Sequence, residues 1–207
     1  MDPVLLFGFV SITLLFVATP GPSVALAASQ AVRFGPRAAV TTVAGDAIGT
    51  VVHIVIAGAS LQTLIALSEV FLPYLQIAGG VFILYLALQA LLDAGKPLAD
   101  ISVKSGRATF LSGFFACVSN PKAIVFFVAL FPGFISPDHS IFVQTMVYGA
   151  IFLVLDAASI LGYALLAMHT FRRTAARFFR VEYLSGLGLF GVGALLIGKG
   201  YRSLPSQ

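Results

Sequence analysis

Six apolar runs, each about as long as a membrane crossing, dominate this sequence of 207 residues. They lie at residues 4–30, 38–60, 70–92, 109–135, 142–168 and 183–201. About 20 apolar residues in an α-helix cross the hydrocarbon core of a bilayer, where only helices or closed barrels satisfy the backbone hydrogen bonds. Runs of this length lack the alternation, about ten residues long, of barrel strands. We therefore predict an all-α membrane protein with six transmembrane helices.

The composition agrees with lipid as the surrounding solvent. The chain is 59% apolar and only 10% charged, with a mean hydropathy of +1.02, so it has too few polar residues to cover a soluble surface. Short connections leave no room for a soluble domain, and we expect a single transmembrane domain over residues 1–207. We expect the first run to remain a membrane span rather than a cleaved signal, because Met1-Asp2-Pro3 carries an acid where a signal is basic.

Basic residues divide the connections into two classes, which predicts the orientation of the chain. Lys and Arg near span ends are retained in the cytoplasm. Connections 62–69 and 136–140 contain neither residue. The other three contain Arg33, Arg37, Lys96, Lys104, Arg107, Arg172, Arg173, Arg177 and Arg180. We therefore expect both termini to be periplasmic, against the weaker effect of Lys199 and Arg202, and we interpret the net charge of +4 as a topology signal rather than a sign of nucleic-acid binding.

Two proline motifs interrupt apolar runs at matching places. The first run contains Thr19-Pro20-Gly21-Pro22 and the fourth contains Asn120-Pro121-Lys122. In each, a cap-forming residue, Thr19 or Asn120, precedes a proline that suits the first position of a helix, so each run should form two half-helices. If the two halves share a fold, they must lie in opposite orientations across the membrane, because each half has three spans, an odd number. Many secondary transporters have this inverted-repeat architecture. The predicted repeats cover about residues 1–95 and 105–207.

Three ionisable residues, Asp46, Lys122 and Asp156, lie inside the runs at a similar predicted depth. A charge at mid-bilayer costs roughly 2.5–3.5 kcal/mol on insertion scales, so such groups pair with one another or serve a transport pathway. An ion pair that only holds helices together is one interpretation. Two acids with one base also leave an acid without a counter-charge, and such an acid is suited to carrying a proton. His53, seven residues after Asp46, shares its helical face and could relay protons or simply bond to a neighbouring helix.

Three motifs together resemble the lysine exporter family, which includes the homoserine and threonine exporters of bacteria. They are Ala18-Thr19-Pro20-Gly21-Pro22, Gly45-Asp46 in a Gly-Asp-x-x-Gly segment, and Ser119-Asn120-Pro121-Lys122-Ala123. The similarity covers essentially the whole chain in length, number of spans and order of motifs. It implies an exporter of amino acids in the bacterial inner membrane, driven by the proton gradient. It does not identify the amino acid.

The resulting site hypothesis has the two half-helix starts facing a bound amino acid. Their free N–H groups and positive dipole ends would meet its carboxylate, Lys122 would strengthen that field, and the acids would receive its ammonium or a proton. The proposed site consists of Thr19, Pro20, Gly21, Pro22, Asp46, Asn120, Pro121, Lys122 and Asp156. The expected partners are an amino acid, protons and the lipid bilayer. The sequence leaves open whether the chain forms a homo-oligomer, and we expect no cofactor.

Two other functions remain as alternatives. The chain could export a metal or another inorganic cation through Asp46, Asp156 and His53, although so few ligands beside Lys122 do not suit a transition metal, and we predict no metal site. It could also be an intramembrane enzyme. The lone Cys117 excludes a CxxC redox pair and the sequence has no HExxH motif, so this alternative has little support.

Overall fold

The computed structural model describes residues 2–66, 68–93, 107–170, 187, 190, 191, 193–195 and 197–204, and this part of the chain contains helices and no strands. The α-helices are α1 (Pro3–Val17), α2 (Pro22–Phe34), α3 (Pro36–Ala66), α4 (Ser68–Asp93), α5 (Arg107–Val118), α6 (Pro121–Val125) and α7 (Ile141–Thr170). A π-helix, η1 (Phe126–Leu130), and a 3-10 helix, η2 (Phe131–Phe134), continue α6. The prediction of an all-helical chain is confirmed.

Two helices in the described residues are long and apolar enough to cross a membrane, Pro36–Ser60 within α3 and Ile141–His169 within α7. Two further pairs pass the same test as bent spans. The α1–α2 pair bends by 53° and the pair formed by Arg107–Val118 and Pro121–Phe134 bends by 43°. The predicted interruptions of the first and fourth runs are therefore confirmed. The third run is helical as predicted in α4. The sixth run at 183–201 is described only at residues 187, 190, 191, 193–195 and 197–201, which are helical, and residues 94–106 and 171–186 lie outside the described residues.

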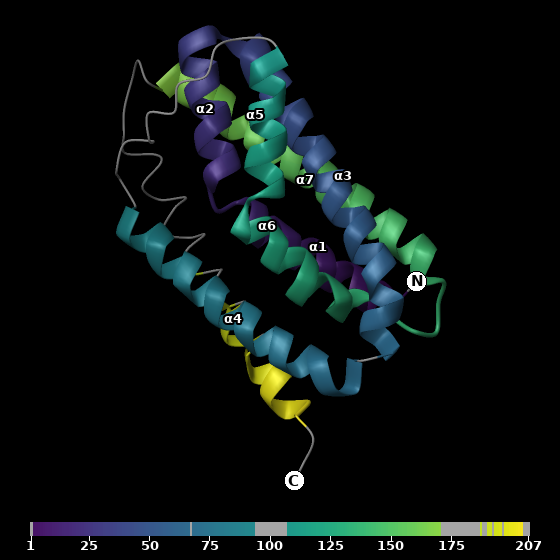
Figure 1. The fold of residues 1–207 in the computed structure, drawn as a ribbon. Coiled ribbons are helices and arrows are strands. Elements are labelled where there is room, and N and C mark those ends of the chain that lie inside the picture. Colours follow the sequence, from purple (N-terminus) through teal and green to yellow (C-terminus); the bar gives the residue numbers. More distant parts are fainter. Residues whose placement is uncertain are drawn as a thin grey trace.

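The two bent pairs run in opposite directions through the molecule (Figure 1). Half-helix α2 contacts α5, whereas α1 contacts η2 at the other end of the fourth run. Figure 1 shows the corresponding arrangement, with α2 and α5 in the upper half and α1 and α6 in the lower half. The long helices α3 and α7 pass both halves. This antiparallel arrangement brings the two breaks together near the middle.

Glycines allow α3 and α5 to touch through their backbones. A Cβ atom on Gly45 would lie 1.9 Å from the carbonyl oxygen of Phe110, and one on Gly113 would lie 2.1 Å from that of Thr42. Both distances are far below any contact that a real side chain makes. Because Asp46 follows Gly45 directly, this close approach carries its carboxyl to the centre of the bundle.

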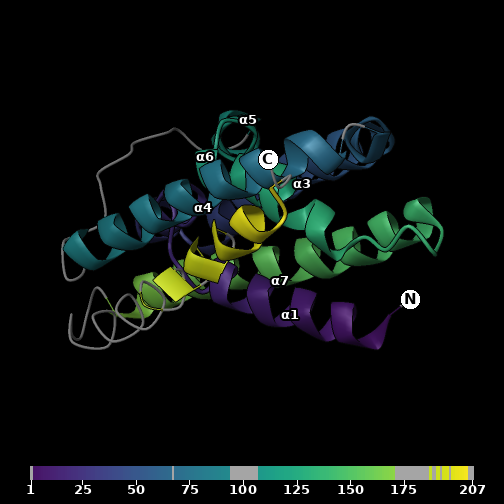
Figure 2. The same ribbon diagram turned by 90° about the horizontal axis from the view of Figure 1, so that it is seen from below.

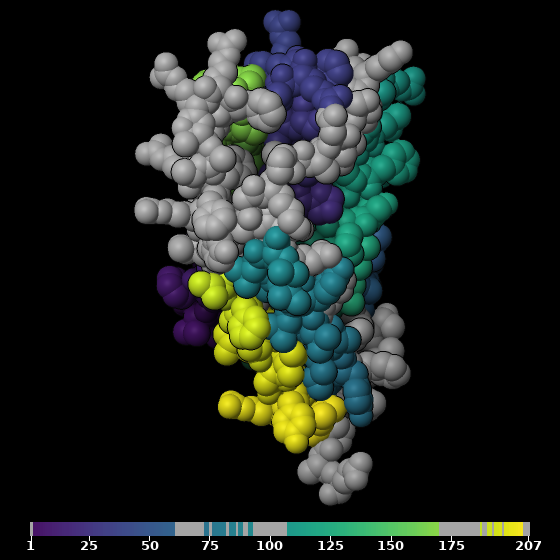
Figure 3. Space-filling model, turned by 90° about the vertical axis from the view of Figure 1, so that its left-hand side faces the viewer, coloured from purple at the N-terminus to yellow at the C-terminus, as the bar shows by residue number. Residues whose placement is uncertain are grey.

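A second glycine contact joins α4 to the C-terminal residues, which lie side by side on one flank (Figures 2 and 3). A Cβ atom on Gly193 would lie 2.9 Å from the carbonyl oxygen of Gly80. Small residues that let helix backbones approach are typical of packing in lipid. On its inner side, α4 packs against α6 and η1.

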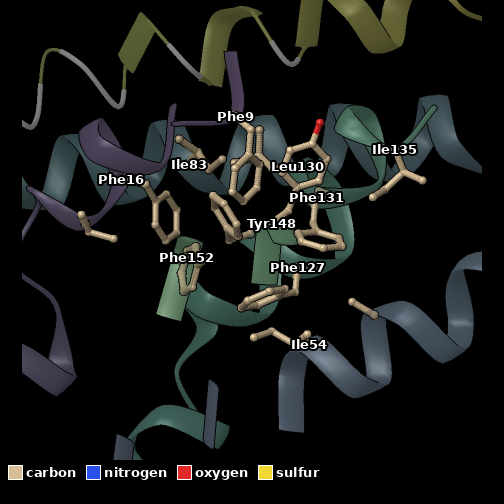
Figure 4. Close-up of a cluster of buried hydrophobic side chains, with 14 of the residues drawn as sticks. Phe9, Phe16, Ile54, Ile83, Phe127, Leu130, Phe131, Ile135, Tyr148 and Phe152 are labelled. Atoms are coloured by element: carbon tan, nitrogen blue, oxygen red, sulfur yellow. The ribbon is translucent and has the colours of Figure 1, made fainter. Parts of the chain in front are cut away.

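Two hydrophobic clusters fill the interior on either side of those breaks. The aromatic cluster contains Phe9, Phe16, Phe126, Phe127, Phe131, Tyr148 and Phe152 from α1, η1, η2 and α7 (Figure 4). The small-residue cluster contains Val24, Ala27, Ala31, Ala39, Val43, Ile160 and Ala164 from α2, α3 and α7. The polar groups described next lie between the two.

Candidate functional site

The two helix breaks meet at the centre of the bundle. The Asn120 side-chain amide donates to the Ser23 hydroxyl at 3.4 Å, which joins the start of α6 to the first turn of α2. The side chain of Lys122 lies against Gly21, where a Cβ atom would be 3.5 Å from its Cδ. The sequence predicted breaks at similar depth, and the structure brings them into contact.

Asn120 caps the second break as predicted. Its backbone is extended, its side-chain oxygen accepts from the N–H of Lys122 at 3.0 Å, and Pro121 occupies the first helical position. An amide or carboxylate oxygen on this first turn satisfies one of the N–H groups that a helix start leaves without a partner.

The first break differs from its prediction, because Thr19 is not the cap and Pro20 does not begin the helix. The new helix starts at Pro22, and Gly21 is its cap with an extended backbone and no side-chain hydrogen bond. A proline disfavours the helical conformation of the residue before it, so Pro22 holds Gly21 outside the helix. The Thr19 hydroxyl instead donates back to the carbonyl of Leu15 at 3.4 Å.

Lys122 binds the carbonyl groups at the end of α1. Its ammonium donates to the carbonyl oxygen of Phe16 at 2.6 Å and to that of Thr19 at 2.5 Å, and it lies 4.5 Å from the centre of the Phe16 ring. Only 8% of this residue is exposed. The negative end of a helix dipole attracts a cation, and the aromatic face adds to that attraction. Among the described residues, no direct ion pair joins Lys122 to Asp46 or Asp156, although Lys122 and Asp156 attract one another electrostatically over a longer distance. The contacts that hold the ammonium in place are those to the two carbonyl groups.

Helix α7 covers the two carbonyl groups between those that Lys122 binds. The Ser159 hydroxyl donates to the carbonyl oxygen of Val17 at 2.6 Å, and the Tyr163 hydroxyl donates to that of Ala18. The four successive carbonyl groups from residue 16 to residue 19 therefore all have side-chain donors. An unpaired backbone group in a dry interior costs about 1–3 kcal/mol, which is why a helix that ends inside the membrane needs such donors.

The two acids lie at the same centre. Asp46 is 2% exposed and its Oδ1 has no hydrogen-bond partner among the described residues, whereas Asp156 is partly buried. The two carboxyl groups interact electrostatically, and that of Asp46 also faces Ser23 and Cys117. Asp46, Asp156 and Lys122 line one cavity together with Gly21, Ser23 and Asn120. The predicted grouping of two acids and one base thus appears in the structure.

That cavity is small. Its volume is about 30 Å³, which has room for about one or two water molecules but not for an amino acid. Phe16 and Phe152 of the aromatic cluster and Val24 and Ile160 of the small-residue cluster also line it. Any larger ligand would require the helices around the breaks to move apart.

His53 lies outside the cavity lining, one layer behind it. Its Nε2 is 3.2 Å from the carbonyl oxygen of Cys117 and must donate to it, because a carbonyl only accepts. Its ring stacks on Phe127 with 5.7 Å between centres. His53 therefore satisfies the end of α5 in the way that Lys122 satisfies the end of α1. The described residues contain no group of three His, Cys, Asp or Glu side chains that could hold a metal ion.

Sequence reasoning missed Ser159 as part of the site. It lies three residues after Asp156 on α7, and Tyr163 lies seven residues after it, so all three share one helical face. This spacing is the signal that could have found it.

Comparison with known proteins agrees with this geometry. Residues 14–200 match a protein-family model described as "LysE type translocator". A homoserine/homoserine lactone efflux protein of Salmonella typhimurium is 32% identical over 163 residues, which cover 78% of this chain and 79% of that protein. A cysteine/O-acetylserine efflux protein of Salmonella paratyphi A is 29% identical over 138 residues, or 67% of this chain and 69% of that protein. An uncharacterized membrane protein of Vibrio cholerae is 29% identical over 200 residues, with 95% and 98% covered. No solved structure matches the chain.

Proposed function

Because the chain belongs to the family of LysE-type translocators, a family of multi-pass membrane proteins, we propose that it exports amino acids or close derivatives across the bacterial inner membrane in exchange for protons. Membership makes it a translocator rather than an enzyme. The observation that carries the substrate class and the coupling is the small central cavity, in which two broken helices meet beside two acids and one lysine.

The substrate carboxylate is assigned to the start of α2. Gly21 has no side chain that could cap this helix, so its first N–H groups remain available to an anion at the positive end of the dipole. The start of α6 already has Asn120 as its cap, so it is the less available of the two. The Lys122 ammonium beside Gly21 adds positive charge.

The substrate ammonium is assigned to the acids, in alternation with a proton. The Oδ1 of Asp46 has no hydrogen-bond donor among the described residues, so it can accept from an ammonium group. Asp156 lines the same cavity. A cation and a proton that compete for the same carboxylates exclude one another, which is the condition for exchange. Export of the amino acid is then coupled to proton entry.

The architecture proposed for this function is a single domain of six spans in two inverted repeats, over residues 1–207, with both termini periplasmic. The antiparallel course of the two bent spans supports the inverted relation. In such transporters, the half-helix ends meet at a site near the midplane, and one repeat moves against the other.

The test is efflux from vesicles. Purified protein is reconstituted into liposomes loaded with labelled L-homoserine, L-cysteine or other amino acids, and release is followed under an imposed proton gradient. We expect gradient-dependent efflux that stops in Asp46→Asn and Asp156→Asn, and persists in Asp138→Asn, whose carboxyl lies in the exposed loop before α7.

Each outcome has a definite meaning. Full activity in both central variants would remove the acids from the mechanism. Absence of efflux for every amino acid, with gradient-driven movement of an inorganic cation, would favour the cation alternative instead.

A further inference from the structure

Several buried polar groups without partners lie on either side of the central cavity. Among the residues that the structure describes, the side chains with such atoms are Thr13, Gln30, Asp46, Thr145 and Tyr148. Buried polar groups are paired in the great majority of cases, and each exception calls for an explanation. Asp46 has one in the central cavity, but the other four lie away from it.

Gln30 lies on the α2 side of the cavity. It is fully buried, and neither its amide nitrogen nor its amide oxygen has a partner in the described part of the chain. It follows Ser23 of the cavity lining by seven residues, so it occupies the same face of α2 about 10 Å farther along. The small-residue cluster packs α2 against α3 and α7 over this stretch. Gln30 therefore lies between the central cavity and the end of α2 at Phe34.

Tyr148 and Thr13 lie on the opposite side of the cavity. Tyr148 is fully buried with its ring 4.6 Å from that of Phe9, and its hydroxyl has no partner. Thr13 follows Phe9 by one turn of α1 and is equally buried. Tyr148 is a member of the aromatic cluster and lies beside Phe9 (Figure 4), and Thr13 lies on α1 between Phe9 and Phe16 of the same cluster.

We propose that the substrate passes along the inner faces of α1, α2 and α7, and that Gln30 and Tyr148 are its polar contacts on the two sides of the central cavity. This inference rests on the proposed export of amino acids. The substrate is a small zwitterion that must keep hydrogen-bond partners while the surrounding helices exclude water. In the conformation described, the aromatic cluster and the small-residue cluster block the route on either side of the cavity. The polar groups on the route therefore have no partners in the described residues until a substrate passes.

Groups that only hold the structure together behave differently. Gln144 is as buried as Gln30, with 1% exposed, but its side chain accepts from the N–H of Ser136 at 2.9 Å and donates to the carbonyl of the same residue at 2.8 Å. The two glutamines form a matched pair, one fully bonded and one without partners.

The first experiment compares variants of Gln30 and Tyr148 with a variant of Gln144. It measures thermal unfolding in detergent and efflux of labelled L-homoserine from liposomes. Gln30→Leu and Tyr148→Phe should keep or raise the unfolding temperature, because each removes a buried polar group that has no partner. Their efflux rates should fall by roughly five-fold, the factor that corresponds to one lost hydrogen bond during transport. Gln144→Leu should lower the unfolding temperature, because it leaves groups of Ser136 unpaired.

The second experiment is independent of the transported substrate. Gln30→Cys and, as a control, Thr109→Cys are made in a Cys117→Ala chain and treated in liposomes with a small water-soluble thiol reagent. Both positions are fully buried, but Thr109 is on α5 and belongs neither to the cavity lining nor to the two hydrophobic clusters. We expect labelling at position 30 and none at position 109.

Four results would overturn the proposal. They are wild-type efflux in both Gln30→Leu and Tyr148→Phe, a large loss of stability in those variants, no labelling at position 30, or equal labelling at positions 30 and 109. If the wild type moves none of the amino acids but position 30 alone is labelled, the proposed cargo fails while the route stands.

Discussion

At the scale of single residues, the helix breaks depend on donors that come from other helices. Lys122, Ser159 and Tyr163 all donate to carbonyl groups at the end of α1, and His53 donates to the end of α5. In water these carbonyl groups would bind solvent, but hydrocarbon offers none. Each donor therefore has a structural task at the place where the chemistry is proposed, and its loss should be visible in stability as well as in transport.

Replacing Lys122 by methionine should destabilise the protein. The substitution keeps most of the side-chain volume but removes the ammonium donor from both carbonyl oxygens. Phe16 keeps the backbone N–H of Thr19 as a donor at 3.2 Å, whereas Thr19 loses the donor described for its carbonyl oxygen, at about 1–3 kcal/mol. Thermal unfolding of Lys122→Met in detergent measures the loss. Lys199→Met is the matched control. Lys199 is exposed, and the hydrogen bond described for its ammonium, to the carbonyl oxygen of Gly133, is 3.5 Å long. Equal stability of the two variants would contradict the role given to Lys122.

Ser159→Ala should have a smaller effect of the same kind. It removes the donor to the Val17 carbonyl oxygen, so we expect a loss of about 1–3 kcal/mol in the free energy of unfolding. Ser112→Ala serves as the control, since that hydroxyl is exposed and bonds to the carbonyl of Ala108 in its own helix. Chemical denaturation followed by circular dichroism compares the two, and an unchanged midpoint in Ser159→Ala would be the contrary result.

At the scale of elements, the position of Asp46 depends on how closely α3 approaches α5. Gly45 and Gly113 let the two backbones touch, and Gly49 packs on Cys117, where an added Cβ would be 2.7 Å from the Cys117 Cβ. In lipid the packing of small residues replaces much of the hydrophobic driving force that water supplies to soluble proteins. Separation of these two helices would move Asp46 away from α5.

Gly45→Ala and Gly113→Ala should therefore destabilise the protein by about 1–3 kcal/mol, because each added methyl group overlaps a backbone carbonyl. Gly162→Ala on α7 is the control. An added Cβ there has nothing within 4 Å, and alanine is the better helix former by up to about 1 kcal/mol. The unfolding temperature should fall for Gly45→Ala and Gly113→Ala, and it should stay level or rise for Gly162→Ala. The reverse order would exclude close α3–α5 packing.

At the scale of the whole molecule, charge separates the two ends. The helix ends that carry Arg33, Arg37 and Arg107 lie together at the upper end in Figure 1, opposite the N-terminus and the start of α7. Basic residues near span ends are retained in the cytoplasm, so this end is the cytoplasmic one in our proposal. The small-residue cluster then closes the cytoplasmic side of the cavity and the aromatic cluster closes the periplasmic side.

Thiol labelling of intact spheroplasts tests this orientation. In a Cys117→Ala chain, Asp138→Cys in the exposed loop before α7 should react with a membrane-impermeant reagent. Phe34→Cys, at the exposed end of α2, should react only after lysis. The Cys117→Ala parent reports the background. Labelling of Phe34→Cys alone in intact cells would reverse the proposed orientation.

Much of the fold follows from local properties of the sequence. The length of the apolar runs predicts α3, α4 and α7, because a helix is the only open structure that satisfies its own backbone in lipid. Asn120 and Pro121 determine their own helix start, since capping involves neighbours in the chain. The position of the first break was predicted correctly, but the predicted first residue of the new helix, Pro20, was two residues too early. The helix begins at Pro22, because this proline disfavours a helical backbone at Gly21 before it.

Local patterns in the chain are enough to predict that it is helical, that two runs are broken, and that Asp46, Lys122 and Asp156 lie inside apolar runs. The atoms that these groups meet depend on how the helices pack. Lys122 binds carbonyl groups more than 100 residues away in the chain, at Phe16 and Thr19, and not the acids that its charge suggested. The reason is that a carbonyl group appears identically at every residue of a sequence. Whether it lacks a partner depends on where its helix ends in space and on which side chains arrive there.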